Sequence, residues 1–187
     1  ELTHQAHHDP LTGLPNRRAF ESRLRRAVQS AKELGSRHAL LYFDLDHFKP
    51  VNDTAGHAAG DELLRQLAKL LRTQLREHDA LARLGGDEFG ILLEDATPEQ
   101  ASYVAEKVRR AIANYQFEWQ GEIFRIGASI GQLEFADGKL SAYELLYRAD
   151  EMCYLAKSRG RDRVVAFSRE RDRGASLPKS VSALRSN

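Results

Sequence analysis

The sequence has almost no cysteine, no excess of either charge and no long hydrophobic run. Its single cysteine, Cys153, excludes an internal disulfide framework and a zinc site made only of cysteines. Cys153 lies among apolar residues at helical spacing, which favours a buried structural thiol over a reactive one. A formal net charge of +1 provides no global field for nucleic acid or an acidic membrane. We therefore expect no nucleic-acid partner and no membrane contact by this segment.

The absence of a membrane-length apolar run or a signal peptide leaves a reducing, cytoplasmic setting as the default expectation. The 187 residues, 42% hydrophobic and 29% charged, are enough for one domain with a sizeable core. We expect residues 1–8 to end an upstream helix or linker; their three histidines fit a solvated linker better than a metal site. Residues 9–167 would form the domain, and the Arg- and Ser-rich residues 168–187 a flexible tail or linker. Because Glu1 is an unlikely native start, an upstream module is expected.

Hydrophobic periodicity and capping signals predict the element order α-β-α-β-β-α-β-β-α-β. Helices are expected over residues 16–35, 63–75, 97–115 and 141–156, and strands over 38–46, 80–84, 89–93, 117–119, 122–134 and 163–167. The order contains a βαββαβ core. This indicates an α+β fold of the ferredoxin-like or polymerase-palm kind, with an antiparallel-rich sheet flanked by helices.

Two glycines followed by two acids mark the most informative stretch, residues 84–89. Its flanks are apolar enough to be strands, so Gly85-Gly86 fits a two-residue hairpin turn that needs positive φ. Asp87 would then lie at the mouth of a sheet. A carboxylate there must be solvated, protonated or bound to a cation.

A second pair of acids ends the strand expected over residues 38–46. Strand alternation puts Asp44 and Asp46 on one face, with Leu41, Phe43 and Leu45 on the other. In a βαββ unit this strand can lie beside the hairpin, close to Asp87, where carboxylates repel unless a divalent cation neutralises them. Mg²⁺ suits a few carboxylates, a backbone carbonyl, water and phosphate oxygens. The alternative, solvated charges at strand ends, is weaker when both motifs are present.

The residues after this strand suggest binding of a phosphate group and of a nucleotide base. Lys49 is placed to meet the charge of a transferring phosphoryl group, although alone it would be taken for a surface lysine. Backbone N–H groups around His47 and Phe48 can cradle phosphates. Asn52 and Asp61 offer an amide and a carboxylate, and a carboxylate accepts from the N1–H and N2–H₂ edge of guanine. On chemistry alone, helix capping is the better interpretation of these two.

Residues 9–17, 44–61, 85–89 and 156–161 match, in order, the pattern of GGDEF domains, the bacterial diguanylate cyclases. The resemblance covers roughly residues 9–167 and rests on several separated motifs. It implies that two GTP molecules condense to cyclic di-GMP and two pyrophosphates. It also implies a head-to-head homodimer in which each subunit presents one GTP.

The resemblance implies a role for each matching residue. Mg²⁺ (or Mn²⁺) would be bound by Asp44, the Leu45 carbonyl and Asp87, with Asp87 also the base for the 3′-hydroxyl and Glu88 a supporting metal or site-shaping residue. Lys49 would stabilise the transition state, His47 and Phe48 would contact the substrate, Asn52 and Asp61 would recognise guanine, and Lys157 and Arg161 would contact the terminal phosphates.

Arg76 and Asp79 stand where this family often carries an RxxD inhibitory site for its product. Arginine can bind a phosphate or the Hoogsteen edge of guanine, and aspartate can accept from the guanine N1–H. The alternative is an arginine favoured by a helix dipole. Arg109, on a neighbouring helix, is a further candidate for this site.

Three other functions stay open at this point. One is a catalytically silent receptor for GTP or cyclic di-GMP, which intact Gly85, Gly86, Asp87 and Glu88 disfavour. Another is a polymerase-like nucleic-acid enzyme, which would need a basic channel to bind its template. A dinucleotide made from ATP and GTP is the third, because Asp61 favours guanine without excluding a mixed product.

Overall fold

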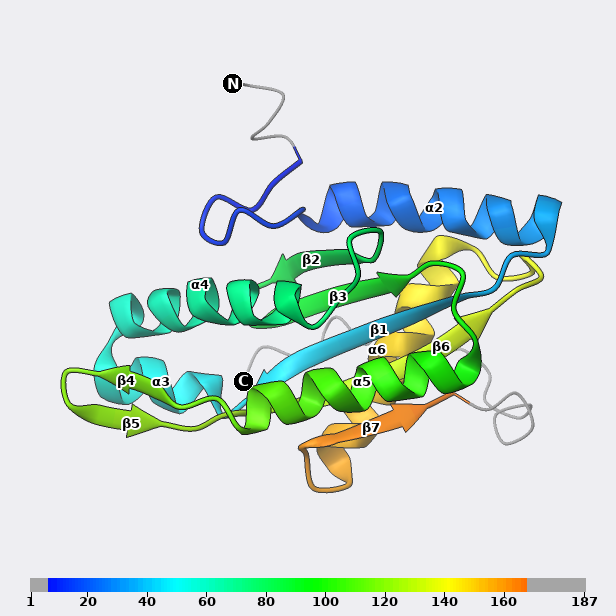
Figure 1. Cartoon of the computed structure of the whole chain (residues 1–187). Helices are drawn as coiled ribbons and strands as arrows, with labels where there is room; N and C mark the ends of the chain where they lie inside the picture. Colours follow the sequence, from blue (N-terminus) through cyan, green and yellow to red (C-terminus); the bar gives the residue numbers. More distant parts are fainter. Residues whose placement is uncertain (1–6, 168–187) are drawn as a thin grey trace.

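The central strand of the structure, β1 (His38–Asp46), is buried along its whole length. The computed structural model describes residues 7–167 (Figure 1). The other elements are α2 (Arg17–Leu34), α3 (Phe48–Ala55), α4 (His57–Thr73), β2 (Ala80–Gly85), β3 (Glu88–Leu93), α5 (Pro98–Ala113), β4 (Phe117–Trp119), β5 (Glu122–Phe124), β6 (Gly127–Phe135), α6 (Ala142–Ser158) and β7 (Arg163–Ala166).

Five strands form the main sheet in the order β2-β3-β1-β6-β7. β1 pairs antiparallel with β3 on one side and with β6 on the other, and only β6 and β7 are parallel. Strands β4 and β5 form a separate hairpin. The mostly antiparallel sheet with flanking helices confirms the predicted α+β class.

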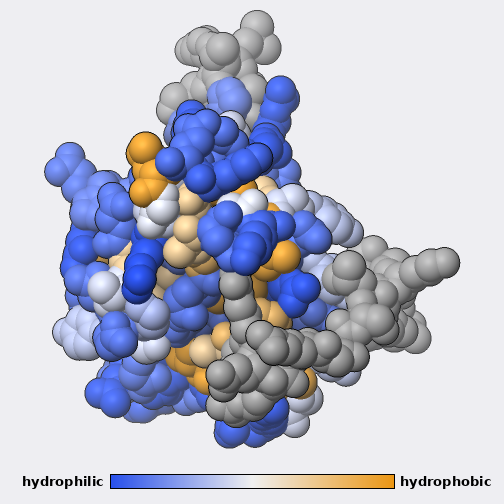
Figure 2. Space-filling view, turned by 90° about the vertical axis from the view of Figure 1, so that its right-hand side faces the viewer, coloured by the Kyte–Doolittle hydropathy of each residue, from blue (hydrophilic) through white to orange (hydrophobic). Residues whose placement is uncertain are grey.

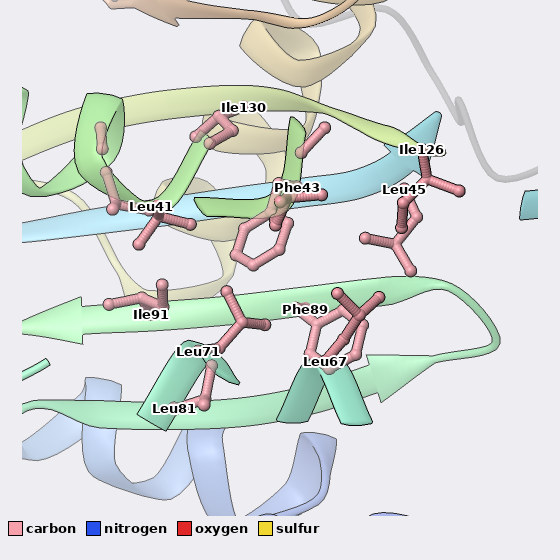
Figure 3. Close-up of a cluster of buried hydrophobic side chains, with 14 of the residues drawn as sticks. Leu41, Phe43, Leu45, Leu67, Leu71, Leu81, Phe89, Ile91, Ile126 and Ile130 are labelled. Carbon is pink, nitrogen blue, oxygen red and sulfur yellow. The ribbon is translucent and has the colours of Figure 1, made fainter. Parts of the chain in front are cut away.

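Helices cover both faces of this sheet, which is why β1 is apolar on both sides. Helices α4 and α5 pack on one face and α2 and α6 on the other (Figure 1). Leu41, Phe43 and Leu45 enter the α4/α5 core, where Phe43 stacks on Phe89 of β3 (Figure 3). Leu40 and Tyr42 enter the α2/α6 core. The predicted alternation of β1 is therefore confirmed.

The helix caps also follow the sequence. Asn16 accepts a hydrogen bond from Ala19 N, and Gly35 ends α2 with a φ of 67°. Thr97 with Gln100, and Ser141 with Glu144, form complete capping boxes at α5 and α6. The three N-terminal caps provide partners for backbone N–H groups that the first helical turn leaves unpaired, and at the other end of α2 Gly35 N donates to Ala31 O.

The Gly85-Gly86 turn prediction is wrong by one residue. Gly85 still belongs to β2 and pairs with Glu88, so the two-residue loop is Gly86-Asp87. Neither glycine adopts a positive φ. A register shift between Arg83 and Gly85 bends β2 and moves the turn along the chain. Asp87 consequently lies in the loop itself.

Two element boundaries also differ from the sequence prediction. Residues 122–134 form two strands because the β1–β6 ladder ends at the pair Asp46–Gly127, and the chain before Gly127 leaves the sheet. The segment before the leucine-rich helix is helical as well: α3 precedes α4, and Gly56 joins them with a φ of 86°. The predicted turn at Gln120-Gly121 is present, with positive φ at both residues.

Cys153 is fully buried, and its Sγ donates to Ser129 O, as expected for a structural thiol. Burial raises the pKa of this thiol. Within residues 7–167, no helix combines the length and apolar character needed to cross a bilayer. Figure 2 shows one side of the molecule as largely hydrophilic, with small hydrophobic patches. Most of residues 1–8, and all of 168–187, lie outside the described residues.

Helix α6 lies so close to β6 that one position between them must be glycine. A Cβ on Gly131 would lie 2.0 Å from Ala149 O and 2.6 Å from Cys153 N, both backbone atoms. Neither atom can move without shifting the helix that carries Lys157.

We expect Gly131→Ala to lower the free energy of unfolding by about 3 kcal/mol, because α6 must move away from the sheet. Urea unfolding followed by circular dichroism measures this loss. Gly86→Ala is the matched control, since a Cβ there meets nothing within 4 Å. Equal stability of the two variants would contradict the close packing.

Candidate active site

Two carboxylates meet where β1 ends beside the β2–β3 loop. Leu45 N donates to Asp87 O with an N···O distance of 3.1 Å, which fastens the loop to the strand. Asp44, the preceding residue, is only 2% exposed. The predicted approach of Asp44 and Asp87 is present, since the charge of Asp44 acts on the Asp87 carboxyl.

Lys157, in the last turn of α6, forms an ion pair with Asp44. The two residues are 113 positions apart in the sequence. The ammonium lies against the Asp44 carboxylate, where the sequence interpretation placed a metal ion. Lys157 was expected to contact phosphate, and its partner in this structure is instead a predicted metal ligand.

The environment of Asp87 disfavours its charged form. Burial raises the pKa of the Asp87 carboxyl, and the negative charges of Asp44 and Glu88 raise it further. A backbone hydrogen bond and the Lys157 ammonium act in the opposite direction. The net effect raises the pKa above the usual value of 3.8. A carboxyl with a raised pKa is a better proton acceptor near neutral pH than an ordinary aspartate.

Glu88 is directly opposite Asp44 in the β1–β3 ladder, so both side chains lie on the same face of the sheet. Its Oε2 accepts from Arg17 Nη2 at 3.2 Å, and Arg17 Nε donates to Leu84 O. The structure therefore places Glu88 in contact with α2. Two roles were implied for Glu88, as a supporting metal ligand or as a site-shaping residue. Its contact with Arg17 fits the second role.

A second arginine braces the loop from the other side. Arg83 donates to Gly86 O through Nε and Nη2, at 3.0 and 2.8 Å, and its Nη1 binds the Asp9 carboxylate. Asp9 also accepts from the backbone and hydroxyl of Thr12. No role for Arg17 or Arg83 was predicted from the sequence. The only available signal was that Asp9 and Arg17 fall within a segment matching the family pattern.

The donor set fits a hard divalent cation that keeps water or phosphate ligands. Within the described part of the chain, no group of three or more His, Cys, Asp or Glu side chains is arranged to hold a metal. Asp44, Asp87 and the Leu45 carbonyl provide two carboxylates and one carbonyl, as Mg²⁺ requires when substrate oxygens complete its shell. The charge repulsion that raises the pKa of Asp87 is what a cation would relieve.

Beyond β1, two helices present the remaining predicted residues. His47 adopts a left-handed conformation with a φ of 64° at the N-cap position of α3, and Lys49 of α3 is exposed. Asn52 of α3 packs against Gly60 of α4, since a Cβ at Gly60 would lie 1.9 Å from Asn52 Oδ1. Asp61 follows directly and is exposed. The predicted base-recognising pair therefore lies at one helix–helix contact.

Asp46 holds the loop after α6. Its Oδ1 accepts from Ser129 Oγ at 2.8 Å and its Oδ2 from Asp162 N at 2.9 Å. Arg161, in this loop, is exposed, and its N donates to Ala156 O. The Asp44 and Asp46 side chains share one face as predicted, and the structure gives Asp46 a supporting role beside the site.

Arg76 and Asp79 border a separate cavity of about 390 Å³ between the end of α4 and α5. Asp79 is 4% exposed, and its Oδ2 accepts from Arg76 N at 2.9 Å. Arg76 is exposed, and its guanidinium has no hydrogen bond or ion pair within residues 7–167. The six residues of β2 separate this cavity from the Asp87 loop, about 20 Å at the usual rise of a strand.

Arg109 is not among the residues that line this cavity. It binds Glu106 and, through Nη1 at 2.8 Å, Asp162 on the other side of α5. The α5 residues that line the cavity are Glu99, Gln100, Tyr103, Val104 and Lys107, and Lys107 Nζ donates to Gln74 O. Lys107 and Arg109 are two positions apart, which turns their side chains about 200° from each other around α5.

Comparison with known proteins places these features in one family. A family model described as "Diguanylate cyclase, GGDEF domain" matches residues 6–163. The chain is 48% identical over 167 residues to the Probable diguanylate cyclase DgcE of Escherichia coli, covering 89% of this chain and 15% of DgcE. It is 43% identical to the Diguanylate cyclase TpbB of Pseudomonas aeruginosa, covering 86% and 37%. The chain thus spans well under half the length of these relatives.

The fold resembles solved structures of such domains. One is the coiled coil and GGDEF domain of DgcB from Caulobacter crescentus in complex with c-di-GMP. Its TM-score is 0.83 at 31% identity, covering 89% of this chain and 88% of DgcB.

We expect Asp87→Asn to stabilise the metal-free protein at neutral pH. A folded-state pKa above the unfolded value means that ionised Asp87 costs stability, and this cost disappears as the carboxyl protonates in acid. The gain should therefore shrink as the pH falls towards about 4. Urea unfolding with a chelator measures it, with the exposed Asp53→Asn as control. A gain that does not depend on pH would refute this interpretation.

Proposed function

The chain belongs to the GGDEF family of diguanylate cyclase domains, and from this premise we propose that it joins two GTP molecules into cyclic di-GMP and two pyrophosphates. The observation that carries the proposal is the meeting of Asp44 and Asp87 at the Leu45–Asp87 hydrogen bond. Intact acids at both positions favour an enzyme over a silent receptor of GTP or cyclic di-GMP.

In the proposed reaction, the 3′-oxygen of one GTP attacks the α-phosphorus of the other. The bond from that phosphorus to the bridging oxygen breaks, and pyrophosphate leaves. Asp87 accepts the proton of the 3′-hydroxyl, as a carboxylate positioned beside it can. Lys49 meets the negative charge that develops on the phosphoryl oxygens. Repeating the step with the roles of the two nucleotides exchanged closes the ring.

The divalent ion, Mg²⁺ or Mn²⁺, would be held by Asp44, Asp87 and the Leu45 carbonyl. When bound it neutralises phosphate charge and favours ionisation of the attacking hydroxyl. The chain's own residues then position the substrate. Lys157 and Arg161 bind the terminal phosphates, and the N–H groups near His47 and Phe48 bind those closer to the ribose.

Base selection is assigned to Asn52 and Asp61. Asp61 accepts from N1–H and N2–H₂ of guanine, a donor pair that adenine lacks. Their support in this structure is the α3–α4 contact, where Gly60 allows Asn52 to lie directly against α4. GTP is therefore the proposed substrate at this site, in preference to a mixed use of ATP and GTP.

The proposed active unit is a homodimer in the cytoplasm, with one GTP on each subunit. One chain offers one nucleotide site, whereas the product contains two nucleotides. The curated relatives are much longer than this chain, which supports a further sensory or receiver domain in the full-length protein. Input from such a domain would act by bringing two of these domains face to face.

Product inhibition is proposed for the cavity at Arg76 and Asp79. The Asp79 carboxylate is held by the hydrogen bond from Arg76 N. The Arg76 guanidinium is exposed beside the cavity. The DgcB structure is a complex with c-di-GMP, which supports product binding as a property of such domains. Lys107 replaces Arg109 in our assignment, because of these two residues only Lys107 lines the cavity.

Incubation with GTP and Mg²⁺ should yield cyclic di-GMP, detected by chromatography and mass. We expect Asp87→Ala to reduce the rate by about 10³-fold or more, since it loses both the base and a metal ligand. Glu118→Ala removes an exposed acid on β4 and is the matched control. The enzyme assignment fails if verified dimers form no product. If Asp87→Ala retains activity, the base and metal roles assigned to Asp87 fail.

Arg76→Ala should weaken inhibition by cyclic di-GMP about tenfold or more, because it removes a charge-assisted hydrogen bond to the ligand. Initial rates at increasing product concentration give the inhibition constant. Arg110→Ala, an exposed arginine of α5 outside the cavity lining, is the control. Unchanged inhibition in Arg76→Ala would remove this cavity from the proposal.

A further inference from the structure

The Lys157–Asp44 ion pair occupies the carboxylate that the proposed metal also needs. Asp44 is 2% exposed, and a charge so deeply buried is costly unless an opposite charge lies beside it. In this structure Lys157 supplies that charge. An ammonium and a divalent cation cannot both lie against the same carboxylate without repelling each other.

The Lys157 ammonium can reach a different partner by a change of rotamer, without movement of α6. The Lys157 side chain is 29% exposed, and its long stem has several rotatable bonds. The end of α6 is held by the bond from Arg161 N to Ala156 O and by the bond from Asp162 N to Asp46. Movement of the ammonium therefore needs a change of rotamer, with no shift of the backbone.

We propose that Lys157 is a displaceable counter-ion that makes metal binding depend on the nucleotide. In the metal-free protein it neutralises Asp44. When the metal arrives with GTP, the metal replaces the ammonium at Asp44, and the terminal phosphates receive Lys157. This inference rests on the proposed function, because it takes Asp44 as a metal ligand and a triphosphate as the substrate.

The exchange predicts weak binding of the metal alone. Without nucleotide, an entering cation must displace Lys157 into water and remain close to its charge. With nucleotide, the phosphates stabilise the displaced ammonium. Metal and nucleotide therefore favour each other's binding by the same factor, as thermodynamic linkage requires. The site stays closed to free divalent cations until substrate is present.

Mn²⁺ binding without nucleotide tests the inference, with free Mn²⁺ counted by electron paramagnetic resonance. Lys157→Met keeps the length of the stem and removes the charge, and we expect it to bind Mn²⁺ about tenfold more tightly than the unaltered protein. Lys157→Arg, which keeps the charge, should bind as weakly as the unaltered protein. Lys69→Met removes an exposed charge from α4 and is the matched control. Equal Mn²⁺ affinity in Lys157→Met and the unaltered protein overturns the inference.

A second measurement separates this inference from the proposed function. 3′-Deoxy-GTP lacks the attacking hydroxyl, so its binding with Mn²⁺ can be followed by calorimetry without turnover. If the unaltered protein does not bind it, the proposed function fails. If it binds while Lys157→Met shows no gain in Mn²⁺ affinity, only the inference fails. Should Lys157→Met not fold, Lys157→Gln, which keeps a hydrogen-bond donor, replaces it with the same expected gain.

Discussion

The charge of Asp44, held almost entirely out of water, is the constraint around which the site is organised. A carboxylate in such surroundings needs a positive partner, and the structure provides Lys157 from a distant helix. Burial raises the pKa of Asp87, which the loop holds beside β1 through the Leu45 bond, and the charge of Asp44 raises it further. The pKa of Asp87 and the position of Lys157 therefore both depend on one buried side chain, which is also a proposed metal ligand.

The fold explains why Asp44 is buried. Because helices cover both faces of the sheet, its central strand β1 stays out of water up to its last residue. The two acids of this strand, Asp44 and Asp46, lie at its end. Two arginines, Arg17 and Arg83, then hold the adjoining loop from opposite sides, one through Glu88 and Leu84 O, the other through Gly86 O. The loop is thus fixed by the scaffold before any ligand binds.

Local signals predicted local structure well. The Asn16 cap, the two capping boxes and the Gln120-Gly121 turn are all present, because each depends on residues within four positions of one another. The Gly85-Gly86 turn was misplaced because the irregular pairing of β2 with β3, and not the turn residues alone, sets where the chain reverses. The roles assigned to Lys49, Asn52 and Asp61 stay predictions, although their positions around α3 and α4 agree with them.

The sequence by itself determined the family, the α+β class and the set of acids near the end of β1. These follow from short motifs and from the alternation of apolar residues, which are local properties. Only the tertiary structure decided which charges meet: Lys157 with Asp44, Arg17 with Glu88, and Arg109 with Asp162. Such pairs join residues far apart in the chain, and no local pattern specifies them. They arise when packing of α2, α5 and α6 on one sheet brings distant side chains within reach.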